Sequence, residues 1–144
     1  MQVGPLRSFP VLRDLVVDRR PLVEFFARQR LHLLPSEEQE LSAIFEVPPA
    51  YGELAACTEC LACLATCPSF DAGNLGDPED PEKPGFGGPL TFVKLAQLHF
   101  DPRDAEDRRA QAKALGVGAC RSCQTRCTCP IGVRIYPSAI VPLL

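Results

Sequence analysis

The stretch that decides the fold is CTECLACLATCP, residues 57–68, in which four cysteines are spaced C-x-x-C-x-x-C-x-x-x-C and a proline follows the last. Four thiolates at this spacing can wrap a cubane iron–sulfur cluster. In two-cluster proteins with this pattern, the cysteine before the proline reaches across to the other cluster. Cys67 therefore predicts a second cluster site elsewhere in the chain.

A second group of cysteines lies in CRSCQTRCTCP, residues 120–130, and all eight cysteines of the chain fall within the two groups. Each group ends in Cys-Pro, and proline fixes φ and removes a donor, so the chain turns away from the cluster there. By the crossover rule, each group lends one ligand to the other site. We expect the first cluster at Cys57, Cys60, Cys63 and Cys129, and the second at Cys67, Cys120 and Cys127, with Cys123 left open.

The role of Cys123 decides how many irons the second site holds. The spacing C-x-x-C-x-x-x-C-x-C-P is one residue shorter than the regular pattern and places Cys127 unusually close to Cys129. If Cys123 is a ligand, the site can hold four irons, whereas a three-iron cluster is more natural without it. The assignment between Cys123 and Cys127 therefore stays open at this stage.

Zinc is the main alternative, because paired C-x-x-C groups also build tetrahedral zinc sites. Zinc ribbons use two such pairs, however, and would leave the third and fourth cysteines of each group idle. A disulfide framework would not explain the two Cys-Pro endings. The iron–sulfur interpretation is favoured, and both it and the zinc alternative imply a reducing compartment.

Composition narrows the class of protein further. The chain has 144 residues, which suits one domain, and a formal net charge of −3 without a polybasic face, so we expect no nucleic-acid partner. Its apolar runs are too short to cross a bilayer, and residues 1–10 do not read as a secretory signal. We expect a cytoplasmic protein, peripheral at the inner face of the cell membrane only through partner subunits.

The sequence predicts a mostly helical chain. We divide it into an extended N-terminal segment, residues 1–20, and a two-cluster helical domain, residues 21–144. Within residues 10–18 we expect Leu15, Val16 and Val17 to be buried. Apolar periodicity predicts helices over residues 22–34, 37–46, 89–100 and 104–115. The first follows Pro21, the second follows the capping box Ser36/Gln39, and the last is capped by Asp104. We expect an exposed acidic loop over 71–89.

The usual parts of a catalytic site are missing from the sequence. His32 and His99 lie in predicted helical segments without an obvious carboxylate or nucleophile partner, and we interpret both as partly buried structural histidines. No Gly-rich nucleotide fingerprint follows a strand, and no P-loop motif is present. We therefore expect electron transfer without catalysis by this chain alone.

Several motifs in one order resemble the iron–sulfur subunit of succinate dehydrogenase and fumarate reductase, in its C-terminal, alpha-helical ferredoxin-like domain. The matching segments are residues 9–18, CTECLACLATCPSF at 57–70, GPLTFVKLAQLHFDPRDAEDR at 88–108, and the closing segment from Cys129-Pro130 to Ile140. The resemblance implies an all-α domain with two cluster-binding loops. It also implies a relay of single electrons between a flavoprotein and a quinone at a membrane anchor.

The resemblance further implies a [4Fe–4S] cluster at the first site and a [3Fe–4S] cluster at Cys67, Cys120 and Cys127. Quinone contact would involve Pro68, Ser69 and Arg121. The chain departs from the family in three ways. It begins where the family's [2Fe–2S] domain would end, so either a separate [2Fe–2S] subunit is a partner or electrons enter directly at the first cubane. It has no tryptophan, and Arg121 stands where many members place a histidine.

The third departure is Cys123 itself. An additional cysteine at this place resembles the four-cysteine motifs of heterodisulfide-reductase-like and glycolate-oxidase-like iron–sulfur subunits, in which the second site holds a [4Fe–4S] cluster. A subunit of such a complex is therefore the alternative interpretation.

Overall fold

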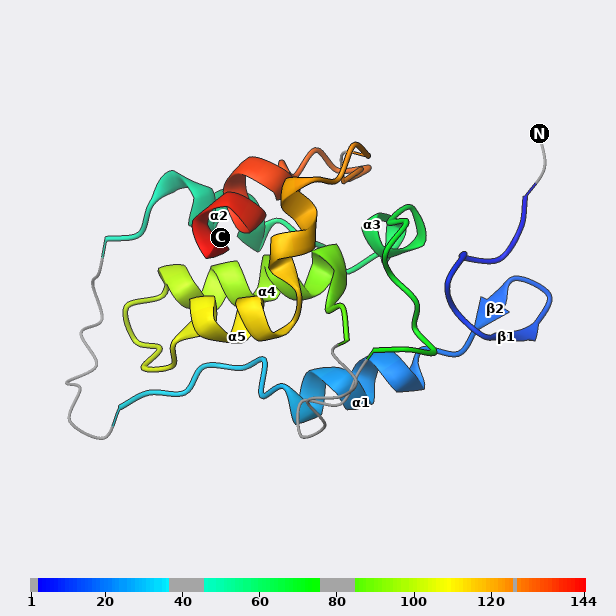
Figure 1. Cartoon of the computed structure of the whole chain (residues 1–144), viewed down its shortest axis with the longest axis horizontal. Coiled ribbons are helices and arrows are strands. Elements are labelled where there is room, and N and C mark those ends of the chain that lie inside the picture. Colours follow the sequence, from blue (N-terminus) through cyan, green and yellow to red (C-terminus); the bar gives the residue numbers. More distant parts are fainter. Residues whose placement is uncertain (1–2, 37–45, 76–84, 126) are drawn as a thin grey trace.

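The computed structural model describes residues 3–36, 46–75, 85–125 and 127–144. Its elements in chain order are β1 (Val11–Arg13), β2 (Val16–Val17), α1 (Arg20–Arg28), α2 (Pro49–Ala55), α3 (Ala62–Ala65), α4 (Gly88–Phe100), α5 (Arg108–Ala114), the 3-10 helix η1 (Val117–Arg121), the π-helix η2 (Tyr136–Ile140) and α6 (Val141–Leu143). The predicted all-α class is confirmed, because the described residues form only one small two-stranded sheet (Figure 1).

Helix α4 is the centre of the helical core, with α2, α5 and η2 packed against it (Figure 1). A helix that is surrounded by other elements is apolar on nearly every side. The sequence GPLTFVKLAQLHF fits that position, and most of its side chains from Leu90 to Ala96 are buried. Its bounds agree with the helix predicted over 89–100: Pro89 lies in its first turn, and Asp101-Pro102 follows its end.

Gly88 lets α4 begin directly against the first cysteine run. Its φ is +81°, in the left-handed region, and a Cβ there would lie 2.6 Å from Cδ2 of Phe70 and 2.8 Å from Cδ2 of Leu64. Both neighbours are buried. Only glycine combines that φ with so close an approach without strain.

The N-terminal segment corrects one prediction. Strands β1 and β2 pair antiparallel, with Val11 opposite Val17 and Asp14 at φ +51° in the turn between them. This hairpin lies at one end of the molecule, away from α4 (Figure 1). Leu15 and Val16 are therefore 55% and 60% exposed rather than buried, while Val17 is partly buried.

The helix predicted over 22–34 is shorter than expected. Helix α1 ends at Arg28, and Arg30 has a φ of +50°, which no helix accommodates. The helix predicted over 37–46 falls mainly on residues outside those that the structure describes. Pro49 follows the helix predicted over 37–46 and begins α2, because a proline tolerates the first turn, where its missing N–H has no helical partner.

The capping prediction before α5 was also wrong. Asp107 caps the helix, accepting a hydrogen bond from the Ala110 N–H at 2.9 Å. Asp104 is instead buried in an ion pair with Arg108, and the side chains of both residues are 1% exposed. The two histidines, His32 and His99, are exposed rather than partly buried.

Candidate iron–sulfur centres

The cysteines line two cavities, and each cavity takes cysteines from both sequence groups. The first cavity, of about 20 Å³, is lined by Cys57, Cys60, Cys63 and Cys129. The second cavity, of about 580 Å³, is lined by Cys67, Cys120, Cys123 and Cys127. These are the two sets of cysteines that the crossover rule predicts, and Cys123 lies beside the other three cysteines of the second set. That the two sets bind clusters stays a prediction.

The loop of the first cysteine run is shaped by two left-handed residues. Glu59 has a φ of +53° and Leu61 a φ of +66°, and both stand next to Cys60. Left-handed residues within a turn direct successive backbone N–H groups toward one side, which makes a concave site for anions and for iron–sulfur clusters. Such strained residues persist only where the surroundings hold them.

Two contacts hold this loop in place. The Leu61 side chain is buried, at 3% exposure, just before α3 begins at Ala62. Glu59 accepts an ion-paired hydrogen bond of 2.5 Å from Nζ of Lys94 on α4, and Lys94 also lies over the ring of Phe26. The central helix therefore positions the loop that carries Cys57, Cys60 and Cys63.

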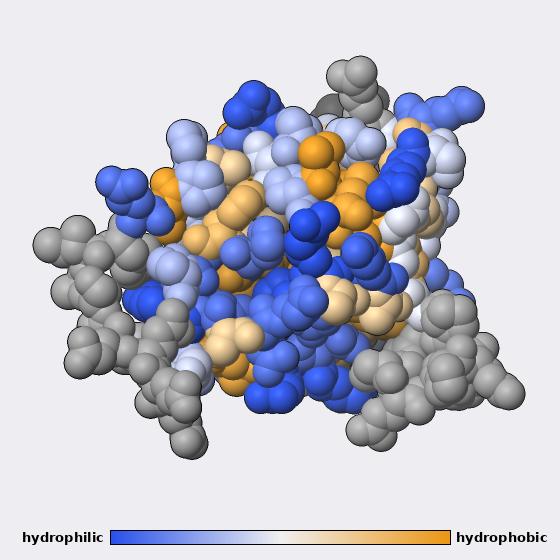
Figure 2. Space-filling view, turned by 60° about the vertical axis from the view of Figure 1, so that its left-hand side comes forward, coloured by the Kyte–Doolittle hydropathy of each residue, from blue (hydrophilic) through white to orange (hydrophobic). Residues whose placement is uncertain are grey.

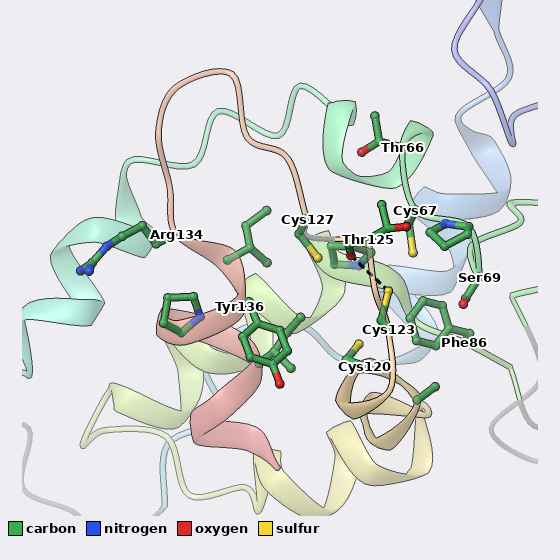
Figure 3. Close-up of a pocket in the computed structure, with 16 residues that line it drawn as sticks. Thr66, Cys67, Ser69, Phe86, Cys120, Cys123, Thr125, Cys127, Arg134 and Tyr136 are labelled. Atoms are coloured by element: carbon green, nitrogen blue, oxygen red, sulfur yellow. Dashed lines mark hydrogen bonds between the residues drawn. The ribbon is translucent and has the colours of Figure 1, made fainter.

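Three parts of the chain supply the sulfurs of the second cavity. Cys67 follows α3, Cys120 is buried in η1, Cys123 is exposed beyond η1, and Cys127 lies farther along the same loop. Figure 3 shows the four labelled sulfurs around one space, with Phe86 and Tyr136 at its sides. Apolar side chains, among them Pro89, Ile135 and Ile140, form much of the remaining wall.

The residues predicted for quinone contact divide in the structure. Pro68 and Ser69 line the second cavity beside Cys67. Arg121 is exposed, and its Nη2 donates a hydrogen bond of 3.3 Å to the carbonyl oxygen of Leu144 at the end of the chain. The structure thus places Pro68 and Ser69 together and Arg121 against the C-terminus.

Burial and neighbouring sulfurs make free thiolates unfavourable in both cavities. Burial, with a smaller contribution from the other cysteines nearby, raises the pKa of Cys63 and of Cys120 to about 12 each. The same two causes raise the pKa of Cys127 to about 11. Deprotonated sulfurs at these positions require a bound positive centre, which is how metal binding displaces protons from thiols.

The two cavities are close neighbours. Ile135 lines both of them. The charge of Cys127, in the second cavity, contributes after burial to the raised pKa of Cys63, in the first. Groups bound in the two cavities would therefore lie near one another, with Ile135 between them.

The donor set fits iron–sulfur clusters. Each cavity offers four sulfurs, and soft thiolate ligands select iron–sulfur clusters, zinc or Cu(I) over hard cations. In the part of the chain that the structure describes, no three His, Cys, Asp or Glu side chains are grouped as a site for a single metal ion. For the small first cavity, the fit depends on the sulfurs and the loop that carries them rather than on free volume.

A carboxylate that sequence reasoning missed anchors the segment after Cys129. Glu53 on α2 accepts hydrogen bonds from the backbone N–H and the guanidinium of Arg134, and from the hydroxyl of Ser138. These bonds, mainly from Arg134, lower the pKa of Glu53 to about 2. The partners are more than 80 residues apart, so no local sequence signal could have found them.

No protein-family model and no curated protein matches this chain. A solved structure does. The chain is similar to a chain of the "Mycobacterium smegmatis Sdh1 complex in the apo form", with 30% identity and a TM-score of 0.72 over 97% of its own length. It spans 58% of that chain, somewhat more than half. The similarity is consistent with a succinate dehydrogenase-related subunit. Among the described residues, no helix is long and apolar enough to span a membrane.

Proposed function

We propose that this chain is an electron-transfer iron–sulfur subunit of an oxidoreductase related to succinate dehydrogenase and fumarate reductase. The observation that carries the proposal is the sharing of cysteines between the two sequence groups. Three cysteines of the first group and one of the second line the first cavity, and one of the first group and three of the second, Cys123 included, line the second cavity. This is the arrangement that two adjacent clusters require. The similarity to the Sdh1 complex chain supports the same conclusion.

In this proposal the first cavity holds a [4Fe–4S] cluster and the second holds a [3Fe–4S] or a [4Fe–4S] cluster. Bound clusters would supply one-electron oxidation and reduction. The thiolates of the chain would bind the irons, and the N–H groups of the loop around Cys60 would stabilise the negative charge of the first centre. Apolar residues such as Ile135 and Phe86 would restrict water around the second.

The proposed partners are a flavoprotein subunit and a membrane anchor. The chain would then lie at the inner face of the cell membrane through its partners. Pro68 and Ser69, which line the open second cavity, are the residues proposed to meet a quinone or another acceptor. Arg121, in the neighbouring segment η1, is proposed to contact the same acceptor.

One observation favours a second candidate. Because Cys123 lines the second cavity with three other cysteines, the site offers the four-sulfur set of heterodisulfide-reductase-like or glycolate-oxidase-like subunits. In that case the chain passes electrons between two [4Fe–4S] centres and a different catalytic subunit.

Co-purification tests the proposed function. A tagged chain, expressed in its own organism and isolated anaerobically, should bring with it a flavin-containing subunit. The complex, but not the chain alone, should bleach its cluster absorbance when succinate is added. An isolated, flavin-free chain that oxidises a substrate by itself would contradict the proposal. A complex without flavin but with a cysteine-rich catalytic subunit would favour the second candidate.

A further inference from the structure

Cys123 differs from the other sulfurs of the second cavity in its exposure. Cys120 is buried, Cys67 and Cys127 are partly buried, and Cys123 is exposed. Cys123 nevertheless lines the same cavity as these three. Any metal atom that it binds would therefore lie at the solvent side of a site whose other ligands lie deeper.

A hydrogen bond of Cys123 also distinguishes it. The Cys123 Sγ donates to the backbone carbonyl oxygen of Thr125 at 3.1 Å, which Figure 3 shows as a dashed line. Thr125 lies in the same loop and lines the same cavity. Cys123 therefore has a hydrogen-bond acceptor for its thiol when it binds no metal.

Cys60, the exposed cysteine of the first cavity, is a useful contrast. It stands between the left-handed residues Glu59 and Leu61 in a loop fixed by Lys94. The first cavity is also much smaller than the second, at about 20 Å³ against about 580 Å³. Exposure alone therefore does not make a ligand exchangeable; Cys123 combines exposure with an open cavity and an alternative hydrogen-bond acceptor.

From these differences, and on the basis of the proposed function, we propose that Cys123 binds one exchangeable iron of a [4Fe–4S] cluster in the second cavity. One-electron oxidation releases that iron and leaves a [3Fe–4S] cluster on Cys67, Cys120 and Cys127. The oxidant, ferricyanide in the experiment below, takes one electron from [4Fe–4S]²⁺. The products are [3Fe–4S]⁺ and Fe²⁺, and the freed Cys123 thiolate takes a proton from water. Fe²⁺ with one electron from dithionite reverses the change.

The test uses the anaerobically purified holoprotein. One equivalent of ferricyanide is added, and iron release, the EPR spectrum and thiol alkylation by iodoacetamide, mapped by mass spectrometry, are followed on the same sample. We expect about one iron released per chain, a new [3Fe–4S] signal, and alkylation at Cys123 alone. Subsequent Fe²⁺ and dithionite should remove the signal and protect Cys123 again.

Two variants sharpen the result. Cys123→Ser should show the [3Fe–4S] signal as isolated, with the first cluster unchanged, and Ser122→Ala, at the neighbouring exposed position, should behave like the original chain. Alkylation of Cys60 before Cys123 would overturn the inference, as would a Cys123 already reactive in a protein that carries a three-iron centre from the start. The latter result would leave the proposed relay standing, whereas a chain without iron would overturn both.

Discussion

The buried ion pair between Asp104 and Arg108 gives the sharpest prediction about stability. Arg108 reaches from α5 toward the segment after α1, where its guanidinium donates to the backbone carbonyl oxygens of Arg30 at 3.2 Å and His32 at 2.8 Å. Asp104 accepts two bonds from that guanidinium and one, at 3.1 Å, from the N–H of Leu34. We predict that Asp104→Asn strongly destabilises the chain.

The magnitude follows from burial. Arg108 is 1% exposed, so loss of the carboxylate leaves an uncompensated guanidinium in the core. Removing one partner of a buried ion pair costs about 3–5 kcal/mol. Because carbonyl acceptors remain for Arg108, we expect the lower part of that range, about 3 kcal/mol. For a chain of 144 residues this corresponds to a melting temperature lower by about 10 °C.

The matched control is Glu106→Gln, the same chemical change in a surface pair. Glu106 lies 3.8 Å from Arg30, and the two side chains are 48% and 62% exposed, so its loss should cost at most about 1 kcal/mol. Both variants are unfolded anaerobically as holoproteins at one scan rate, with helicity followed by circular dichroism. If Asp104→Asn melts within a degree or two of Glu106→Gln, the reasoning about the buried charge is wrong.

The remaining predictions concern backbone, charge and ligands. Gly88→Ala should lower the free energy of unfolding by about 2–4 kcal/mol, because a Cβ at φ +81° meets Phe70. Gly52→Ala, in helix α2 with nothing within 4 Å of the added Cβ, should raise the free energy of unfolding by about 0.5–1 kcal/mol. Denaturant unfolding measures both changes. Because the pKa of Glu53 is lowered from 4.5 to about 2, this carboxylate stabilises the fold fully above pH 4.5, and that stabilisation is lost as the pH falls toward 2. The difference in melting temperature between the original chain and Glu53→Gln should therefore shrink over that pH range. A constant difference would refute the assignment. Cys57→Ser should remove the first cluster and the fold of its loop, halving the cluster absorbance, whereas an unchanged iron content would show that Cys57 is not a ligand.

Local patterns predicted the parts of the structure that depend on near neighbours. The bounds of α4 follow from Pro89 and Asp101-Pro102, which limit a helix by their own backbone chemistry. The two cysteine sets followed from spacing together with the crossover rule, which supplies the long-range step that spacing lacks. The structure adds that Cys123 lines the second cavity together with Cys67, Cys120 and Cys127.

The parts that were missed depend on contacts between distant residues. Apolar periodicity continued past Arg28, but α1 ends there because residues 30–34 bond to Arg108 and Asp104 instead. Asp104 has the sequence features of a helix cap, and only the tertiary structure shows that it is buried in an ion pair. Leu15 and Val16 are apolar yet exposed, because composition does not say whether another element covers a hairpin.

EPR spectroscopy tests most directly whether the two shared cysteine sets hold two iron–sulfur clusters. The anaerobically purified chain is oxidised and then reduced with dithionite, and iron, sulfide and zinc are quantified on the same sample. We expect about seven or eight irons per chain, almost no zinc, and two cluster signals that interact magnetically after reduction. A colourless protein with stoichiometric zinc and no iron would contradict this expectation.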